Sequence, residues 1–329
     1  MTGLVTRPPT GLAAPLHKAL TDAAGFAERS LAPATLRAYA DDFKGFAAWC
    51  EKCGIPDQAC PTTAAILAAY VSHRYEDHDA KVPTLTRIVS GVLHAHTAAG
   101  YDAPKGPALK LTMQGIRRRS AERGVRPRRV APAMAEDLRE AVLALSGGEL
   151  KDLRNRALVL LGFAGCFRRS ELVSLEVRDL KLEAGKGYEV LLRRGKTDQE
   201  GRGLTKGIPY GEHPDTCPVR ALQAWLSAAR ITSGPLFVGV NRHGRTTGIR
   251  LHGADVARVV KIAMAAIGRD ATSFSGHSLR AGLITTAANA GKSMKVIMDQ
   301  SGHRDMRTLL IYMRMAELFR DNAASSIGL

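Results

Sequence analysis

An arginine-rich stretch near the middle of the chain, residues 116–130 (IRRRSAERGVRPRRV), constrains the fold more than any other feature of the sequence. Gly124 and Pro127 interrupt a helix through this stretch, and Glu122 is its single acidic residue. Its arginines are Arg117, Arg118, Arg119, Arg123, Arg126, Arg128 and Arg129. Because a chain of 329 residues exceeds the usual length of one domain, we expect two domains joined by a basic linker over 123–131.

Before the linker, residues 16–122 carry helical patterns alone. Between Pro33 and Lys52, apolar residues recur at spacings of three and four and predict one buried stripe of a helix. Further helices are predicted at 62–74, 83–99 and 107–122. Together these segments predict a small helical bundle. Residues 1–15 contain three prolines without periodicity, and we expect a flexible arm there.

After Pro132 the pattern changes. Residues 188–192 and 204–210 favour strands, and they flank a polar turn with three glycines (RRGKTDQEGRG). Helices are predicted at 134–146, 152–164, from about Ser170, and at 217–230, 253–267, 277–290, 293–300 and 305–318. The chain is therefore expected to be mainly α with a small antiparallel β-sheet, and 132–329 to form the second domain.

The charge of the chain predicts a polyanionic partner. Lys and Arg number 47 against 31 Asp and Glu, which gives a formal net charge of +16. No apolar run approaches the roughly 20 residues that span a bilayer, and the N-terminal residues lack the apolar core of a signal peptide. We therefore expect nucleic acid rather than membrane as the partner, and a cytoplasmic location. The arginine-rich stretch over 116–130 agrees with this partner. A solvated helix end would not need so many arginines, whereas a linker that follows the nucleic-acid backbone gains affinity from each phosphate that an arginine neutralises.

The cysteines do not predict a metal site. Five of them are scattered along the chain, which indicates a reducing compartment without a disulfide framework. Cys50 and Cys53 have the spacing of a ligand pair, but no second pair follows at zinc-finger distance, and apolar packing explains Cys50. The sequence also lacks a G-x-x-x-x-G-K-[ST] loop and an acidic cluster of the two-metal nuclease kind. We therefore expect neither a metal nor a cofactor.

Two helix starts carry arginines suited to phosphate, which is best held by fixed bidentate donors. Arg168 and Glu171 fall within RRSEL, where helical spacing places them on one face. His277 and Arg280 fall within SGHSLR and are likewise one turn apart. Taken singly, each pair is more often a surface ion pair or a capped helix start.

A third segment, SGH, ends a helix at Gly302, and Tyr312 lies nine residues after His303. A lone tyrosine on an amphipathic helix is usually a half-buried aromatic. The order of all these elements is far more specific: R-x-S-E-L, a lysine in a β-turn, H-S-L-R, G-H, and then the tyrosine. This order resembles the signature of the tyrosine recombinase (phage integrase) family, and FSGHSLRAG and SGHRDMRTLLIYMR are most similar to Cre-type site-specific recombinases.

The resemblance covers most of the chain and is looser before residue 130. It implies a core-binding domain over 16–122 and a catalytic domain over 132–329. It further implies that Tyr312 attacks the scissile phosphate, forming a 3′-phosphotyrosyl link and releasing a 5′-hydroxyl. Arg168 and Arg280 would clamp the non-bridging oxygens, and Glu171 would hold Arg168 in place.

The remaining roles follow from the same resemblance. His277 would donate a hydrogen bond to the phosphate or act as a general base. His303 would also donate; this position is His in most of the family and Trp in Cre. Lys196, in the hairpin turn, would protonate the departing oxygen. Lys206 lies across the same hairpin and stays an alternative, because the register of a hairpin cannot be fixed from sequence.

The implied partner is double-stranded DNA with inverted repeats around a spacer, held by a homotetramer on two sites. A terminal amphipathic helix after Tyr312 would dock on a neighbouring protomer; packing on its own domain is the alternative. Lys44 and Arg87 are candidates for contacts in the major groove, although such side chains are usually only solvated. The linker arginines expected to contact phosphates are Arg117, Arg118, Arg119, Arg126, Arg128 and Arg129.

Three other functions compete with site-specific recombination. A type IB topoisomerase or hairpin telomere resolvase uses a similar site, but chain length and the Cre-like motifs argue against both. A catalytically inactive site-specific DNA-binding protein would have lost the nucleophile or a clamp, and here all the expected positions are filled. A basic scaffold that binds DNA without sequence preference would not need this set of motifs.

Overall fold

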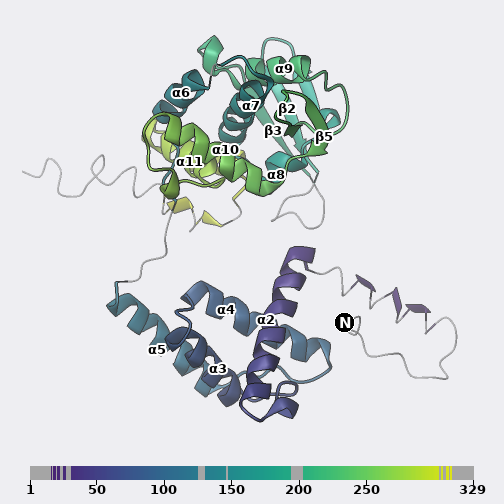
Figure 1. Cartoon of the computed structure of the whole chain (residues 1–329), viewed down its shortest axis with the longest axis vertical. Helices are drawn as coiled ribbons and strands as arrows, with labels where there is room; N and C mark the ends of the chain where they lie inside the picture. Colours follow the sequence, from purple (N-terminus) through teal and green to yellow (C-terminus); the bar gives the residue numbers. More distant parts are fainter. Residues whose placement is uncertain are drawn as a thin grey trace, which may run out of the picture. The chain divides into compact units, whose positions relative to one another are not determined.

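The computed structural model describes residues 31–124, 130–145, 147–193, 203–303, 305–306, 309–310 and 312, with a few residues between 16 and 26. The chain forms two compact units, Met1–Arg128 and Arg129–Leu329 (Figure 1). Three predicted features lie outside the described residues: the arm over 1–15, the turn with Lys196, and the segment after Tyr312.

The N-terminal unit is built from helices among its described residues. They are α2 (Pro33–Lys52), α3 (Ala64–Glu76), α4 (Val82–Ala98) and α5 (Pro107–Glu122), with a short 3-10 turn at Pro56–Gln58. The predicted stripe of α2 supplies Phe46 and Cys50, which are fully buried in the core of this unit. Helices α2 and α4 cross closely at Gly91, where a Cβ atom would lie 3.1–3.2 Å from atoms of Tyr39 and Asp42.

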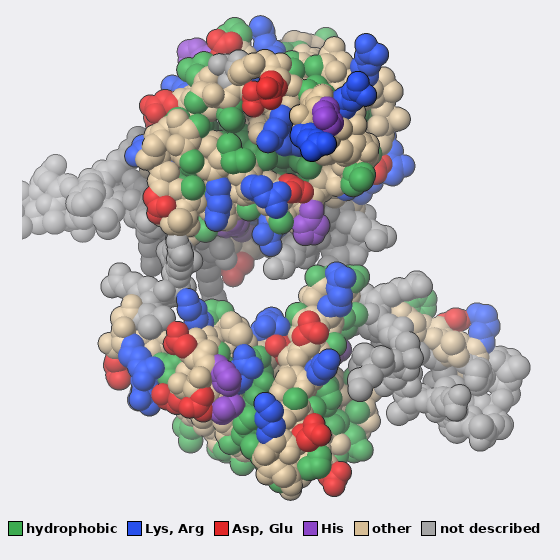
Figure 2. Space-filling model, in the orientation of Figure 1, with side chains coloured by type: hydrophobic (Ala, Val, Ile, Leu, Met, Phe, Trp, Pro, Cys, Tyr) green, Lys and Arg blue, Asp and Glu red, His purple; other side chains and the backbone are tan. Residues whose placement is uncertain are grey.

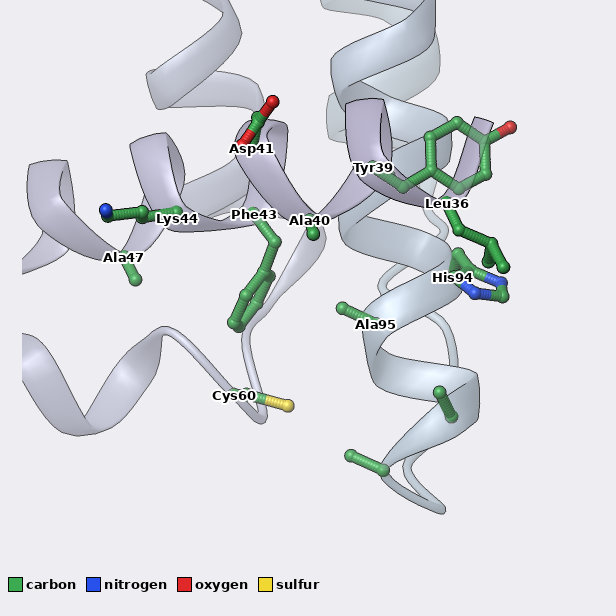
Figure 3. A pocket seen from close by; sticks show the side chains of 13 residues that line it. Leu36, Tyr39, Ala40, Asp41, Phe43, Lys44, Ala47, Cys60, His94 and Ala95 are labelled. Atoms are coloured by element: carbon green, nitrogen blue, oxygen red, sulfur yellow. The ribbon is translucent and has the colours of Figure 1, made fainter. Parts of the chain in front are cut away.

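Beside this crossing, α2 and α4 border an apolar groove of about 840 Å³ (Figure 3). Phe43 of α2, His94 and Ala95 of α4, and Cys60 all line it. Lys44, on the exposed side of α2, belongs to the same lining.

The C-terminal unit combines helices with two small antiparallel sheets. Its helices are α6 (Ala135–Ala144), α7 (Leu150–Ala164), α8 (Arg169–Ser174), α9 (Pro218–Ala228), α10 (Gly253–Ala266), α11 (Ser278–Asn289) and α12 (Met294–Ser301). The first sheet has the order β1 (Leu180–Glu183), β2 (Gly187–Leu192), β3 (Leu204–Pro209), and the second pairs β4 (Val238–Val240) with β5 (Thr246–Arg250). The expected fold class, mainly α with a small antiparallel sheet, is confirmed; β1 and the second sheet were not predicted.

Helix α7 is the central element of this unit. Leu158 and Leu161 on it are fully buried, and the core continues through Phe167 and Trp225. The Trp225 indole donates a 2.7 Å hydrogen bond to the carbonyl of Leu236, so its polar edge is satisfied inside the core. Because α7 is packed on so many sides, the turn that follows it has a fixed starting point.

Among the described residues, no helix is both long enough and apolar enough to cross a membrane.

Candidate active site

The turn after α7 presents the first arginine of the site. It runs through Gly165, Cys166 and Phe167, and Cys166 has a left-handed backbone conformation with φ of 49°. Gly165 is required here, because a Cβ atom on it would lie 2.0 Å from the ring of Phe167. This tight turn reverses the chain and leaves Arg168 at the N-terminal cap of α8.

Glu171 holds Arg168 in two ways. Its Oε1 accepts a 2.5 Å hydrogen bond from Nη1 of Arg168, and its Oε2 accepts a 2.8 Å bond from the backbone N–H of the same residue. The Glu171 side chain is only 4% exposed, whereas the Arg168 side chain is 21% exposed. The predicted pairing is therefore present in the structure, with the carboxylate buried and the guanidinium reaching the surface.

Helix α11 brings the second arginine to the same turn. His277 occupies its N-cap, and Arg280, one turn later, is 1% exposed. Nη1 of Arg280 donates a 2.7 Å hydrogen bond to the carbonyl of Cys166. Burial lowers the pKa of Arg280 from its ordinary value, yet a guanidinium stays charged at neutral pH.

His303 reaches Arg280 from the segment after α12. Gly302 ends that helix in the left-handed region, with φ of 67°, as its position predicts. The ring nitrogens of His303 lie 3.2 and 3.3 Å from Nη2 of Arg280, and Nδ1 lies 2.8 Å from Oγ of Ser301. Burial first, and then the charges of Arg280 and Arg168, lower the pKa of His303 to about 4. The ring is therefore neutral at pH 7.

The hydroxyl of Tyr312 lies 3.3 Å from Nε2 of His277. The Tyr312 ring packs against a small apolar cluster that includes Cys166, Ile284 and Leu309. The pKa of His277 is lowered by desolvation and then by the positive charges of Arg280 and Arg168. A neutral imidazole at this distance can accept the phenolic proton.

Lys206, the alternative to Lys196 as the leaving-group acid, is buried. Its side chain is 2% exposed, its Nζ donates a 2.7 Å hydrogen bond to the carbonyl of Gly165, and it lies 4.9 Å from the centre of the Phe167 ring. Burial lowers the pKa of Lys206 to about 8. An acid that protonates a DNA oxygen must reach the surface, so this burial favours Lys196, which lies outside the described residues, over Lys206.

The predicted DNA-binding residues are more dispersed. Lys44 is exposed, and Arg87 donates a 2.6 Å hydrogen bond to the buried carboxylate of Asp42. Arg119 pairs with Glu76 at 2.8 Å. The exposed arginines of the last turns of α5 are Arg117, Arg118 and Arg119, whereas Arg126, Arg128 and Arg129 lie outside the described residues. Figure 2 shows Lys and Arg side chains on the visible face of each unit, interspersed with Asp and Glu.

Sequence reasoning missed the residues that support the site from behind. Ser301 contacts His303, and Gln300 donates hydrogen bonds to the carbonyls of Ala164 and Gly207. Gln300 acts on backbone carbonyls of distant segments, which no spacing rule identifies, and Ser301 acts on a ring two residues away, a contact that a serine alone does not predict. Across the described part of the chain, no group of three or more His, Cys, Asp or Glu residues is placed to hold a metal ion.

This helical unit, with its arginine–histidine–tyrosine cluster around one turn, has the architecture of the tyrosine recombinases. Residues 133–318 match the model of the phage integrase family, which is more than half of the chain, and the chain belongs to that family. It is 35% identical over 300 residues to an integrase/recombinase xerD homolog of Selenomonas ruminantium, covering 90% of this chain and 86% of that protein.

Two further comparisons agree. The chain is 23% identical over 248 residues to recombinase cre of Escherichia phage P1, covering 71% of each. The fold is similar to that of a lambda integrase tetramer bound to a Holliday junction, with a TM-score of 0.53, 18% identity, and coverage of 90% of this chain and 76% of that one. The chain is thus an enzyme of the tyrosine-recombinase type.

Proposed function

We propose that this enzyme exchanges DNA strands at specific sites by attack of Tyr312 on a scissile phosphate. The observation that carries the proposal is the 3.3 Å approach of the Tyr312 hydroxyl to His277 in the cluster that also holds the two arginines. A phenol next to a neutral imidazole, and close to fixed positive charge, is suited to act as a nucleophile.

The chemistry proceeds without net loss of a phosphodiester bond. The Tyr312 oxygen bonds to the phosphorus, its proton passes to His277, and the bond from phosphorus to the 5′ oxygen breaks. The departing oxygen takes a proton from Lys196. Because the 3′-phosphotyrosyl ester retains the energy of the broken bond, a 5′-hydroxyl from a second strand can reverse the step and join the strands.

Arg168 and Arg280 stabilise the negative charge that develops on the non-bridging oxygens. Arg280 is fixed by the Cys166 carbonyl, and Arg168 by Glu171, so neither guanidinium has to reorganise when the phosphate arrives. Such preorganised donors in a partly buried site act more strongly than the same groups in water.

His303 serves this clamp as a neutral ring. The Ser301 hydroxyl donates to the Met298 carbonyl at 3.3 Å and can accept from Nδ1–H of His303 at 2.8 Å, while Nε2 accepts from Nη2 of Arg280 at 3.2 Å. His303 then orients Arg280 without adding charge, and it donates to the phosphate when its proton moves to Nε2.

On DNA, we propose that the enzyme binds a site of inverted repeats around a spacer and assembles as a tetramer on two such sites. The net charge of +16 supports a DNA partner, and the fold resembles that of the lambda integrase tetramer on a Holliday junction. The exposed arginines at the end of α5 and the basic linker after it would contact phosphates. The segment after Tyr312 would dock on the neighbouring protomer.

The test is a suicide substrate whose nick prevents religation. Tyr312→Phe should bind the site with unchanged affinity and form no covalent protein–DNA adduct, because phenylalanine has no hydroxyl oxygen that could attack the phosphorus. If this variant still forms the adduct, Tyr312 is not the nucleophile. Strand exchange between two duplexes, measured alongside relaxation of supercoiled DNA, separates a recombinase from a topoisomerase that only relaxes.

A further inference from the structure

The C-terminal end of α7 is held by side chains from three other elements. A helix leaves its last carbonyls without partners in its own backbone. Here Gln300 of α12 donates to the Ala164 carbonyl, Lys206 of β3 to Gly165, and Arg280 of α11 to Cys166, each at 2.7 Å. Three successive carbonyls are thus bound where α7 ends and the turn that presents Arg168 begins.

Lys206 is the unexpected member of this set. Strand β3 alternates between exposed and buried positions, and Lys206 shares its buried face with Ile208, where a strand ordinarily carries an apolar residue. No described carboxylate forms an ion pair with the Lys206 ammonium; it contacts the Gly165 carbonyl and the face of the Phe167 ring. The negative end of the α7 dipole and the ring quadrupole both favour a cation there.

A buried cation of this kind does little for stability. Its desolvation opposes burial, and one hydrogen bond and one ring contact offset that cost. The position of Lys206 therefore points to another purpose. Its acceptor, the Gly165 carbonyl, precedes Arg168 by three residues, and the next carbonyl along the chain is bound by Arg280.

We propose that Lys206 is a positioning residue that ties strand β3 to the arginine-bearing turn, so that Arg168 and Arg280 keep a fixed place in the phosphate clamp. The inference rests on the proposed function. Gln300 supports the same connection from α12, since its amide nitrogen contacts the carbonyls of both Ala164 and Gly207, at 2.7 and 3.1 Å.

The test compares Lys206→Met with Lys186→Met, an exposed lysine in the turn between β1 and β2. Thermal melting, affinity for the DNA site and the first-order rate of adduct formation on a suicide substrate are measured for both variants and the wild type. We expect Lys206→Met to fold and to bind DNA as well as the wild type, to melt at a lower temperature because the Gly165 carbonyl loses its donor, and to form the adduct about tenfold or more slowly. Lys186→Met should match the wild type.

The pH profile distinguishes positioning by a charge from a merely structural role. Desolvation lowers the pKa of Lys206 to about 8, while Cys166, Glu171, Arg280 and Arg168 are the charged or titratable groups that act on it. As the pH rises through this value the ammonium is lost, so the wild-type cleavage rate should decline there. The decline should be missing in Lys206→Met, which is slow at every pH.

Equal rates for Lys206→Met and the wild type would overturn the inference while leaving the proposed function intact. The absence of any adduct from the wild type would overturn both. If Lys206→Met fails to fold, Gln300→Leu carries the test, because it removes the second connection between the same elements. It should slow adduct formation without weakening DNA binding, and an unchanged rate would refute the proposal.

Discussion

Replacing Glu171 by glutamine is expected to slow DNA cleavage far more than it weakens DNA binding. Glu171 forms two hydrogen bonds to Arg168, one to the guanidinium at 2.5 Å and one to the backbone N–H at 2.8 Å. Glutamine has nearly the same shape, but it carries no charge and has a single acceptor oxygen. Its NH₂ group would face one of the two donors of Arg168.

The size of the effect follows from these contacts. A charge-assisted hydrogen bond contributes about 1.5–3 kcal/mol, and its loss here leaves Arg168 with one neutral acceptor in place of the carboxylate. Because the Arg168 side chain is 21% exposed, water compensates part of the loss, and we expect a stability decrease of about 1.5–2 kcal/mol. An arginine displaced from the phosphate by the same free energy would slow cleavage roughly tenfold to thirtyfold.

Denaturant melts and single-turnover cleavage under saturating protein measure the two quantities. Glu183→Gln is the matched control, since Glu183 forms a 2.5 Å ion pair with an exposed lysine, Lys181, and such surface pairs contribute about 0–1 kcal/mol. Wild-type cleavage by a folded Glu171→Gln variant would refute the idea that this carboxylate positions the clamp.

Three further outcomes are expected. Replacing Arg117, Arg118 and Arg119 by glutamine should weaken binding to all DNA sequences alike and reduce the salt slope by roughly 0.9 per lost phosphate contact; altered sequence preference in a binding titration would mean that they contact bases. Gly282→Ala should lower the melting temperature sharply, because the new Cβ would lie 1.8 Å from the Ala133 carbonyl oxygen; an unchanged melt would contradict this packing. The pKa of His303 falls from 6.5 to about 4 on folding, so the unfolded state binds more protons and stability should decrease as the pH drops through this window. His303→Asn should flatten that part of a denaturation profile, and an identical profile would show that His303 is not the group responsible.

Much of the fold could be predicted because several of its helices, α2 and α4 among them, are amphipathic. The limits of α2 and α5 agree with the predicted 33–52 and 107–122 at both ends, since proline begins each helix and a glycine follows soon after its end. Strand β1 is only four residues long, and the β4–β5 hairpin contains Gly239, Gly244 and Gly248. Short strands with interrupting glycines carry too little alternation to be separated from loops.

Some residues of the candidate site could likewise be predicted from the sequence, and others could not. The residues with proposed direct roles stand in short motifs whose order along the chain is specific, and the structure brings Arg168, His277, Arg280, His303 and Tyr312 into one cluster. The roles of Lys206 and Gln300 depend on which backbone carbonyl lies opposite in space. Pairing of that kind is set by tertiary packing and leaves no local pattern in the sequence.

The most direct test of the central claim is to identify the residue that becomes attached to DNA. Purified enzyme is trapped on a nicked suicide substrate, the adduct is digested with protease and nuclease, and the modified peptide is sequenced by mass spectrometry. The account predicts a peptide that carries a nucleotide on Tyr312 through a 3′-phosphate. A nucleotide on any other residue, or one linked through a 5′-phosphate, would contradict it.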